Sequence, residues 1–361
     1  LKRVRPKYFI FENVPNFAKH NNGESWREVK KSLTEMGYCV RSTSDSVDEG
    51  KSAKHLSPNQ YGFPQKRDRF FAIGSQKFLP KDPFPISNDI RPRLKNILLT
   101  NKDKKRKKDK LIDLENCNIK EQGVTAINLW NKFIDCLPNK HRDLLSTTPL
   151  WLEEIDADYP YVSQTPYQNF LETGMDIEEI EKKLNILPPY AREKVSRFPL
   201  WKIKFIHSNR EWLSQIKKYI DPIVINDIRK LDYTYRKLEW NWKLSSSSNI
   251  WDHTIQLRPS GVRVSNPTYI PTVVSINANQ SPIYGPLRRH LTRREIARAF
   301  GFPDKMKLLE NSYAGFSALG NAVHVEVAKL VAKNLLTYGQ SNKDNVTNLH
   351  SESSNFDILS A

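Results

Sequence analysis

Residues 8–17 read YFIFENVPNF, and this stretch decides the fold that the sequence predicts. Four apolar or aromatic residues run directly into a carboxylate, Glu12, and then into Asn13. An apolar run of this kind is typical of a buried strand. We therefore expect residues 7–14 to form a central, parallel strand of a doubly wound sheet, with Glu12 at the carboxyl edge of the sheet. The alternative is an ordinary exposed glutamate at a strand end.

The segments that follow alternate between helix and strand patterns. Residues 24–36 carry apolar side chains at helical spacing, and Gly37 directly after them is a stop signal. The patterns of residues 38–46 and 69–75 favour strands. The order strand, helix, strand predicts an α/β fold.

The middle of the chain differs from these segments in composition. Residues 101–110, NKDKKRKKDK, are a solvated surface loop or an arm that contacts phosphates. Residues 176–186 and 209–220 predict helices, and residues 251–276 predict short strands. The polar tail from about Gln340 predicts disorder.

The C-terminal part returns to helices. Thr292 and Glu295 have the spacing of a capping box for a helix over residues 293–300, and Gly301 is expected to end that helix. Residues 321–339 predict a last amphipathic helix.

Charge and composition restrict the class of partner. The 361 residues carry 57 Lys and Arg against 40 Asp and Glu, a formal net charge of +17. Such an excess favours a polyanionic partner, most simply nucleic acid. The alternative is a host organism that favours lysine throughout its proteins.

The cysteine content and the hydropathy of the chain argue against a disulfide-stabilised protein, a metal site and a membrane protein. Cys39, Cys117 and Cys136 have neither metal-ligand spacing nor the count of a disulfide framework, so we expect no metal site. No apolar stretch is long enough to span a bilayer, and no signal peptide follows the basic N-terminus. The sequence is therefore expected to be that of a cytoplasmic protein, with no membrane partner.

Four short segments, in this order, carry a family resemblance. They are FENVPNF (11–17), QYGFPQKRDRFFAIG (60–74), RRHLTRREIARAFGFPD (288–304) and SALGNAV (317–323). Together they resemble the C-terminal motifs of DNA cytosine-5 methyltransferases, over residues 1–80 and 265–335. The segments WKIKFIHSNREW, LEWN and IWDHTIQLRPSGVRV resemble a subgroup of the same enzymes.

The resemblance implies a fold and a division into domains. It implies the C-terminal part of a Rossmann-like, S-adenosylmethionine-dependent methyltransferase sheet, with a mixed α+β target-recognition domain inserted. Residues 1–90 and 266–338 would belong to the catalytic domain, and residues 91–265 to the recognition domain. Residues 339–361 would be a disordered tail.

The resemblance also implies catalytic roles. In the family a cysteine thiolate adds to C6 of cytosine, and a glutamate assists at N3. Glu12 matches that glutamate. Arg67 and Arg69 share one face of a strand; Arg69 is expected to contact the cytosine O2, and Arg67 to support the active-site loop or the DNA backbone. The alternative is a basic surface strand that pairs with Asp68 or other nearby acids.

Two further groups of residues carry binding roles by resemblance. Gly320 would allow a turn, and Asn321 would open the last helix beside the carboxylate of S-adenosylmethionine; a plain helix cap is the alternative. Arg258, Ser260 and Arg263 are expected to contact double-stranded DNA. The alternative for these three residues is a surface turn at Gly261 with a neighbouring arginine. The 293–300 helix is expected to be structural and to hold the catalytic and recognition lobes together.

The resemblance also leaves a gap. The family has a Gly-rich F-x-G-x-G cofactor loop and a Pro-Cys nucleophile before the E-N-V motif, and neither occurs here. We expect a fragment, or one subunit of a split enzyme whose separate N-terminal subunit supplies both motifs. The setting would be the bacterial nucleoid and a restriction–modification system with a cognate endonuclease. The alternative is a non-catalytic, sequence-specific DNA-binding subunit.

Overall fold

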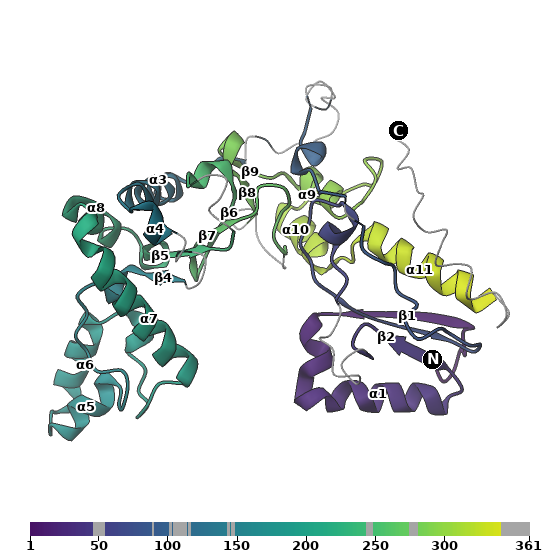
Figure 1. Ribbon diagram of the computed structural model, residues 1–361, viewed down its shortest axis with the longest axis horizontal. Coiled ribbons are helices and arrows are strands. Elements are labelled where there is room, and N and C mark those ends of the chain that lie inside the picture. The colour runs from purple at the N-terminus through teal and green to yellow at the C-terminus, as the bar shows by residue number, and fades with distance from the viewer. Residues whose placement is uncertain are drawn as a thin grey trace. The chain divides into compact units, whose positions relative to one another are not determined.

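The computed structural model describes residues 1–45, 55–88, 90–100, 103, 114, 117–142, 145, 149–242, 248–273 and 281–340. The chain divides into two compact units (Figure 1). Unit 1 comprises Leu1–Asp113, Thr268–Asn277 and Thr292–Ala361; unit 2 comprises Leu114–Pro267 and Ala278–Leu291. The predicted tail beyond Gln340 and the basic run 101–110, apart from Asp103, lie outside the described residues.

Unit 1 is built on a three-stranded sheet. Its strands are β1 (Tyr8–Asn13), β2 (Cys39–Ser42) and β3 (Phe70–Ser75), in the order β1-β3-β2. Both outer strands pair antiparallel with β3, with Glu12 opposite Phe71 and Cys39 opposite Ser75. The buried FFAIG segment is therefore the middle strand of the three.

A helix covers each face of this sheet. On one face α1 (Glu24–Glu35) packs against Phe70 and Ala72, and on the other α11 (Val325–Gln340) packs against Phe71 and Ile73. Figure 1 shows α1 and α11 on opposite sides of the strands. Burial of each large side chain contributes about 2 kcal/mol to this arrangement. The three layers confirm the predicted α/β fold.

The described strands place β1 at an edge of their sheet, so its expected burial is wrong there, while its central, parallel place in a larger sheet stays a prediction. The only described strand that pairs with β1 is β3, and it runs antiparallel. Ile10 and Phe11 are 41% and 37% exposed, because no described strand covers the other edge of β1. An apolar run thus predicts a strand without fixing its place in the sheet.

Local signals predict the helix ends of unit 1 well. Helix α1 is followed by Gly37 at φ +88°. The capping box of Thr292 and Glu295 is present in α9 (Arg293–Ala299), and Gly301 follows at φ +77°. Unit 1 also contains α10 (Ser312–Asn321).

Unit 2 holds a second sheet and most of the helices. The order of its described strands is β4-β5-β7-β6-β8-β9, and among these only the β5–β7 pair is parallel. The strands are β4 (Leu150–Trp151), β5 (Lys237–Trp240), β6 (Thr254–Arg258), β7 (Gly261–Ser265), β8 (Ile283–Tyr284) and β9 (Arg289–His290). The helices are α3 (Glu121–Asp135), α4 (Asn139–Arg142), α5 (Pro166–Glu172), α6 (Ile177–Ile186), α7 (Leu200–Ile216) and α8 (Pro222–Arg229).

Two predicted elements of unit 2 are present in the structure, one of them with different bounds. The strand region 251–276 contains the β6–β7 hairpin, as predicted. The predicted helix 209–220 overlaps the end of α7, which begins earlier, at Leu200 directly after Pro199, and ends at Ile216; a 3-10 turn, Lys217–Tyr219, follows it. Within the described ranges, every helix is too short or too polar to span a bilayer.

Candidate active site

Glu12 and Arg69 form an ion pair in unit 1. Glu12 lies near the end of β1, and Nε of Arg69 lies 2.9 Å from its Oε1. The two side chains are 22% and 13% exposed. Arg69 is placed by its main chain, which exchanges two 3.0 Å hydrogen bonds with Leu56 just before β3. Burial lowers the pKa of Arg69, and the charge of Glu12 opposes that shift.

The guanidinium of Arg69 keeps the N–H donors of Nη2 available. Its Nη1 donates to the main-chain oxygen of Asp68 at 2.8 Å, and its Nε is used by Glu12. Among the described residues Nη2 has no hydrogen-bond partner, and neither has Oε2 of Glu12. The ion pair therefore presents both unused N–H donors and a carboxyl oxygen.

Arg67 points into the protein instead. It is 3% exposed, and it donates to the main-chain oxygens of Val273 at 2.8 Å and Gly320 at 2.9 Å. Its guanidinium carbon lies 5.1 Å from the ring centroid of Phe300. Burial, together with the charge of Arg69, lowers the pKa of Arg67 to about 10. Arg67 thus joins three segments of unit 1 that are distant in the sequence.

The predicted arrangement at Asn321 is wrong in one respect. Asn321 is the last residue of α10, and it does not open the final helix. The chain turns extended at Ala322, and α11 begins at Val325, whose N–H is bound by the oxygen of Phe300. The side chain of Asn321 is exposed, while the carbonyl of Gly320 is occupied by Arg67. An amide is therefore available here, whereas the N–H of Val325 is already bound to Phe300.

His324 is a residue near the site that the sequence analysis missed. It is 3% exposed, lies against Phe63 with ring centroids 4.9 Å apart, and lines a cavity of about 10 Å³ with Arg67 and Arg69. Burial lowers its pKa to about 4, and the charge of Arg67 contributes in the same direction. A histidine beside the GNAV segment is the only sequence signal for it.

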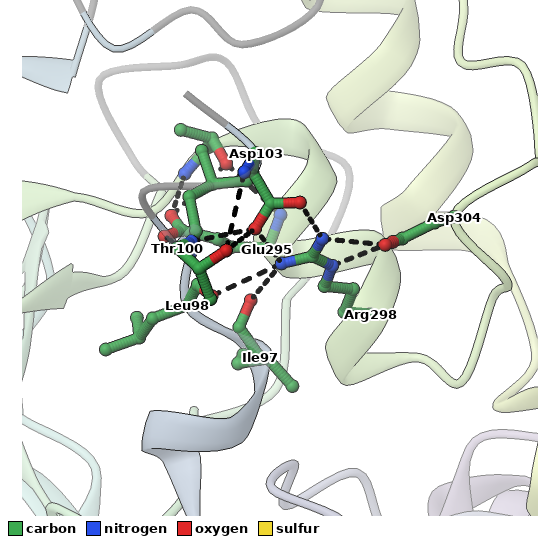
Figure 2. Close-up of polar contacts among 9 residues, drawn as sticks. Ile97, Leu98, Thr100, Asp103, Glu295, Arg298 and Asp304 are labelled. Atoms are coloured by element: carbon green, nitrogen blue, oxygen red, sulfur yellow. Dashed lines mark hydrogen bonds and ion pairs between the residues drawn. The ribbon is translucent and has the colours of Figure 1, made fainter. Parts of the chain in front are cut away.

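Figure 2 shows the polar contacts of helix α9, whose expected structural role between the two lobes stays a prediction. Arg298 contacts Asp103 at 2.9 Å and Asp304 at 2.7 Å, and Glu295 accepts from the N–H of Leu99 at 2.9 Å. The pKa of Asp103 is lowered to about 2, although burial opposes the effect of its hydrogen bonds with Arg298 and Thr100. All these partners belong to unit 1, so the network holds residues 97–100 and Asp103 onto α9.

The predicted DNA-contacting residues lie on the β6–β7 hairpin of unit 2. Arg258 pairs with Gly261 across the turn, and Ser260 at its tip is exposed. Nε of Arg263 lies 3.4 Å from Oε2 of Glu239 on β5. Gly261 has φ +130°, and a Cβ there would lie 2.6 Å from the oxygen of Lys237, so the turn requires glycine.

The three cysteines lie apart from Glu12 in the described structure. Cys39 is opposite Ser75 on β3, whereas Glu12 is opposite Phe71, four residues along the same strand. That separation is about 13 Å along the strand, with one strand between them. Cys117 and Cys136 belong to unit 2, and none of the three cysteines forms a disulfide.

Comparisons with known proteins agree on one family. Residues 1–337 match the model for C-5 cytosine-specific DNA methylases. The Type II methyltransferase M.AluI of Cellulosimicrobium cellulans is 32% identical over 37% of the chain and 26% of its own length. M.HhaI of Haemophilus parahaemolyticus is 31% identical over 26% of the chain and 27% of its own length. The matched segments therefore span about a quarter of each relative.

Solved structures with similarity to the chain are also methyltransferases. The S. pombe Dnmt2 methyltransferase is 14% identical, with a TM-score of 0.36, over 92% of this chain and 67% of its own. The Entamoeba histolytica methyltransferase EhMeth is 12% identical, with a TM-score of 0.36, over 92% of this chain and 63% of its own. On the match over residues 1–337, the chain belongs to the C-5 cytosine-specific DNA methylase family.

Proposed function

We propose that this chain supplies the base-binding pair and the DNA-recognition part of a DNA cytosine-5 methyltransferase of a restriction–modification system. The Glu12–Arg69 ion pair, with its 2.9 Å contact, is the observation that carries the proposal. In cytosine, N3 and the carbonyl O2 are neighbours on one edge of the ring. A carboxyl group and a guanidinium held in contact match that edge.

The chemistry explains why these two groups are needed. C5 of cytosine is a weak nucleophile until a thiolate adds to C6, and the addition moves electron density towards N3 and O2. Glu12 would hydrogen-bond or protonate N3 as that density builds, and Nη2 of Arg69 would donate to O2. The target cytosine must leave the duplex to reach the pair.

S-adenosylmethionine would supply the methyl group when bound. The exposed amide of Asn321 fits the cofactor's carboxylate, because an amide can donate to it. The start of α11 does not fit this role, since the N–H of Val325 is already bound by Phe300. In this chain the cofactor role therefore rests on Asn321, while Arg67 fixes the turn at Gly320 through a 2.9 Å hydrogen bond.

The thiolate would come from outside these three cysteines. Cys39 lies about 13 Å along the sheet from the level of Glu12, and burial of Cys117 makes it unreactive. The cavity beside Arg67 and Arg69 is about 10 Å³, room for one water at most, so other segments must wall the base. A preceding segment or a separate N-terminal subunit is the proposed source of both the thiolate and the walls around the base.

Double-stranded DNA is the proposed substrate. The +17 net charge supports backbone binding. Residues 91–265, most of which fall in unit 2, would form the target-recognition domain, with Arg258, Ser260 and Arg263 as DNA contacts. A cognate restriction endonuclease and a place in the bacterial cytoplasm, on the nucleoid, follow from this role.

The experiment is transfer of labelled methyl groups from S-adenosylmethionine to duplex DNA. The purified 361-residue chain should transfer none alone. Transfer should begin when the polypeptide encoded immediately upstream is added. Glu12→Gln should abolish that transfer while duplex DNA binding persists. Transfer by the chain alone would refute the split active site, and an unchanged rate in Glu12→Gln would remove Glu12 from the mechanism. DNA binding without transfer in any mixture would favour the non-catalytic DNA-binding subunit.

A further inference from the structure

Lys237 of unit 2 lies inside a cage of aromatic rings. Its Nζ is 5.2 Å from the ring centroid of Trp151, 5.1 Å from Tyr190 and 5.0 Å from Tyr233. Trp151 and Tyr190 contact each other with centroids 4.3 Å apart, and the hydroxyl of Tyr190 donates to Glu154 at 2.6 Å. The walls of the cage are therefore held by the fold itself, and they hold the ammonium in one place.

The nearby acids are bound to other cations. Glu153 lies 2.8 Å from Nη1 of Arg236, and Glu239 pairs with Arg263 at 3.4 Å. Among the described residues no carboxylate lies within ion-pair distance of Lys237. Its pKa is lowered, first by burial and then by the charge of Lys202. The electron-rich ring faces offset part of the desolvation of the ammonium, but they do not neutralise its charge.

The sheet register places this charge beside the predicted DNA-contacting residues. Leu238 on β5 and Val262 on β7 are a registered pair and are buried on the inner face. The residues one step before them, Lys237 and Gly261, therefore share the opposite face. Arg258 pairs with Gly261 and lies on that face too. Lys237 and Arg258 thus flank a glycine, and neither has a carboxylate partner among the described residues.

We propose that Lys237 is a phosphate-binding residue that holds the backbone of duplex DNA, with Arg258 beside it. This inference rests on the proposed function and deepens it. The acids near this ammonium are already paired with other cations, so an external anion is the group that can complement its charge. A DNA phosphate supplies a full negative charge from outside the protein core. The aromatic cage reduces the side-chain entropy that a lysine normally loses on binding.

The test is the salt dependence of binding by the full chain to a short mixed-sequence DNA duplex. Lys237→Met should reduce the slope of log affinity against log salt by about 0.9, the value for one lost phosphate contact. Lys237→Arg keeps the charge and should keep the slope. The matched control is Lys230→Met, whose Nζ is paired with Asp227 at 2.8 Å, and it should also leave the slope unchanged.

A second measurement does not depend on the folding of the Met variant. In the wild-type chain with ¹³C-dimethylated lysines, the Lys237 signal, assigned with Lys237→Arg, should show a rise in pKa when DNA is added. An unchanged slope in a folded Lys237→Met chain, or an unmoved Lys237 signal in DNA-bound wild-type chain, refutes the Lys237 assignment alone. Absence of salt-dependent DNA binding by the wild-type chain refutes both this assignment and the DNA substrate of the proposed function.

Discussion

The Nε atom of Arg69 lies 2.9 Å from Oε1 of Glu12, so two residues from separate motifs form one charged unit. The contact depends on the antiparallel pairing of β1 with β3, because Glu12 is opposite Phe71 and Arg69 comes two residues before Phe71. Glu12 orients the guanidinium, and the guanidinium orients the carboxyl group. The pair should therefore act as a unit in mutational tests.

Arg69→Lys tests the donor that the pair leaves available. Lysine keeps the charge opposite Glu12 but loses the planar fork, so it cannot also donate to the base oxygen in the same geometry. We expect a loss of about 10²–10³-fold in kcat of the complemented enzyme, with DNA affinity within a few-fold of wild type. Single-turnover methylation measures the loss in rate, and a DNA-binding assay measures the affinity. The control is Lys66→Arg, on the exposed face of the same segment; equal losses in both variants would contradict the assignment.

Arg67→Met tests the buried anchor. The variant removes hydrogen bonds to the oxygens of Val273 and Gly320 and leaves both carbonyls without their donor. We expect about 3 kcal/mol lower stability of unit 1, because hydrogen bonds from a charged donor are worth about 1.5–3 kcal/mol each. Hydrogen–deuterium exchange in β3 reports unit 1 separately from unit 2. Exchange protection equal to that of the exposed variant Lys77→Met would show that Arg67 is dispensable.

His324→Phe tests the buried histidine through pH. The pKa of His324 falls from 6.5 to about 4 on burial, so the unfolded chain takes up a proton between those values while the folded chain does not. The free energy of unfolding of wild-type unit 1 should therefore fall by roughly 3 kcal/mol as the pH falls from 6.5 to 4. Phenylalanine keeps the contact with Phe63 and removes the titration, so the variant should lose less stability in that window. Parallel stability curves for the two proteins would contradict this prediction.

Glu154→Gln tests the polar core of unit 2. Glu154 is 1% exposed and accepts hydrogen bonds from Tyr159, Tyr190 and Nε of Arg210, the last at 2.8 Å. Glutamine leaves the partly buried Arg210 without its counter-charge, which should lower the free energy of unfolding of unit 2, measured in urea, by about 3 kcal/mol. Glu181→Gln is the control, because its partner Lys194 is exposed and the change should be undetectable. Similar unfolding midpoints for both variants would refute the role of Glu154.

Sequence reasoning succeeds where a signal is local. The capping box of α9, the glycine after α1 and the amphipathic α1 and α11 depend on side chains one or two turns apart. It fails at Asn321, because the same polar residue can start one helix or finish another. The choice depends on Phe300, whose oxygen binds the N–H of Val325 and sets where α11 begins.

The amino-acid sequence by itself determined the α/β class, the family motifs and the excess of positive charge, since composition and short spacings carry that information. Only the tertiary structure decided that Arg69 faces Glu12, that Arg67 is buried between Val273 and Gly320, and that Lys237 sits among three aromatic rings. The physical reason is strand register. Hydrogen bonding between strands distant in the chain sets which side chains meet, and a shift of one residue would turn each of them to the other face.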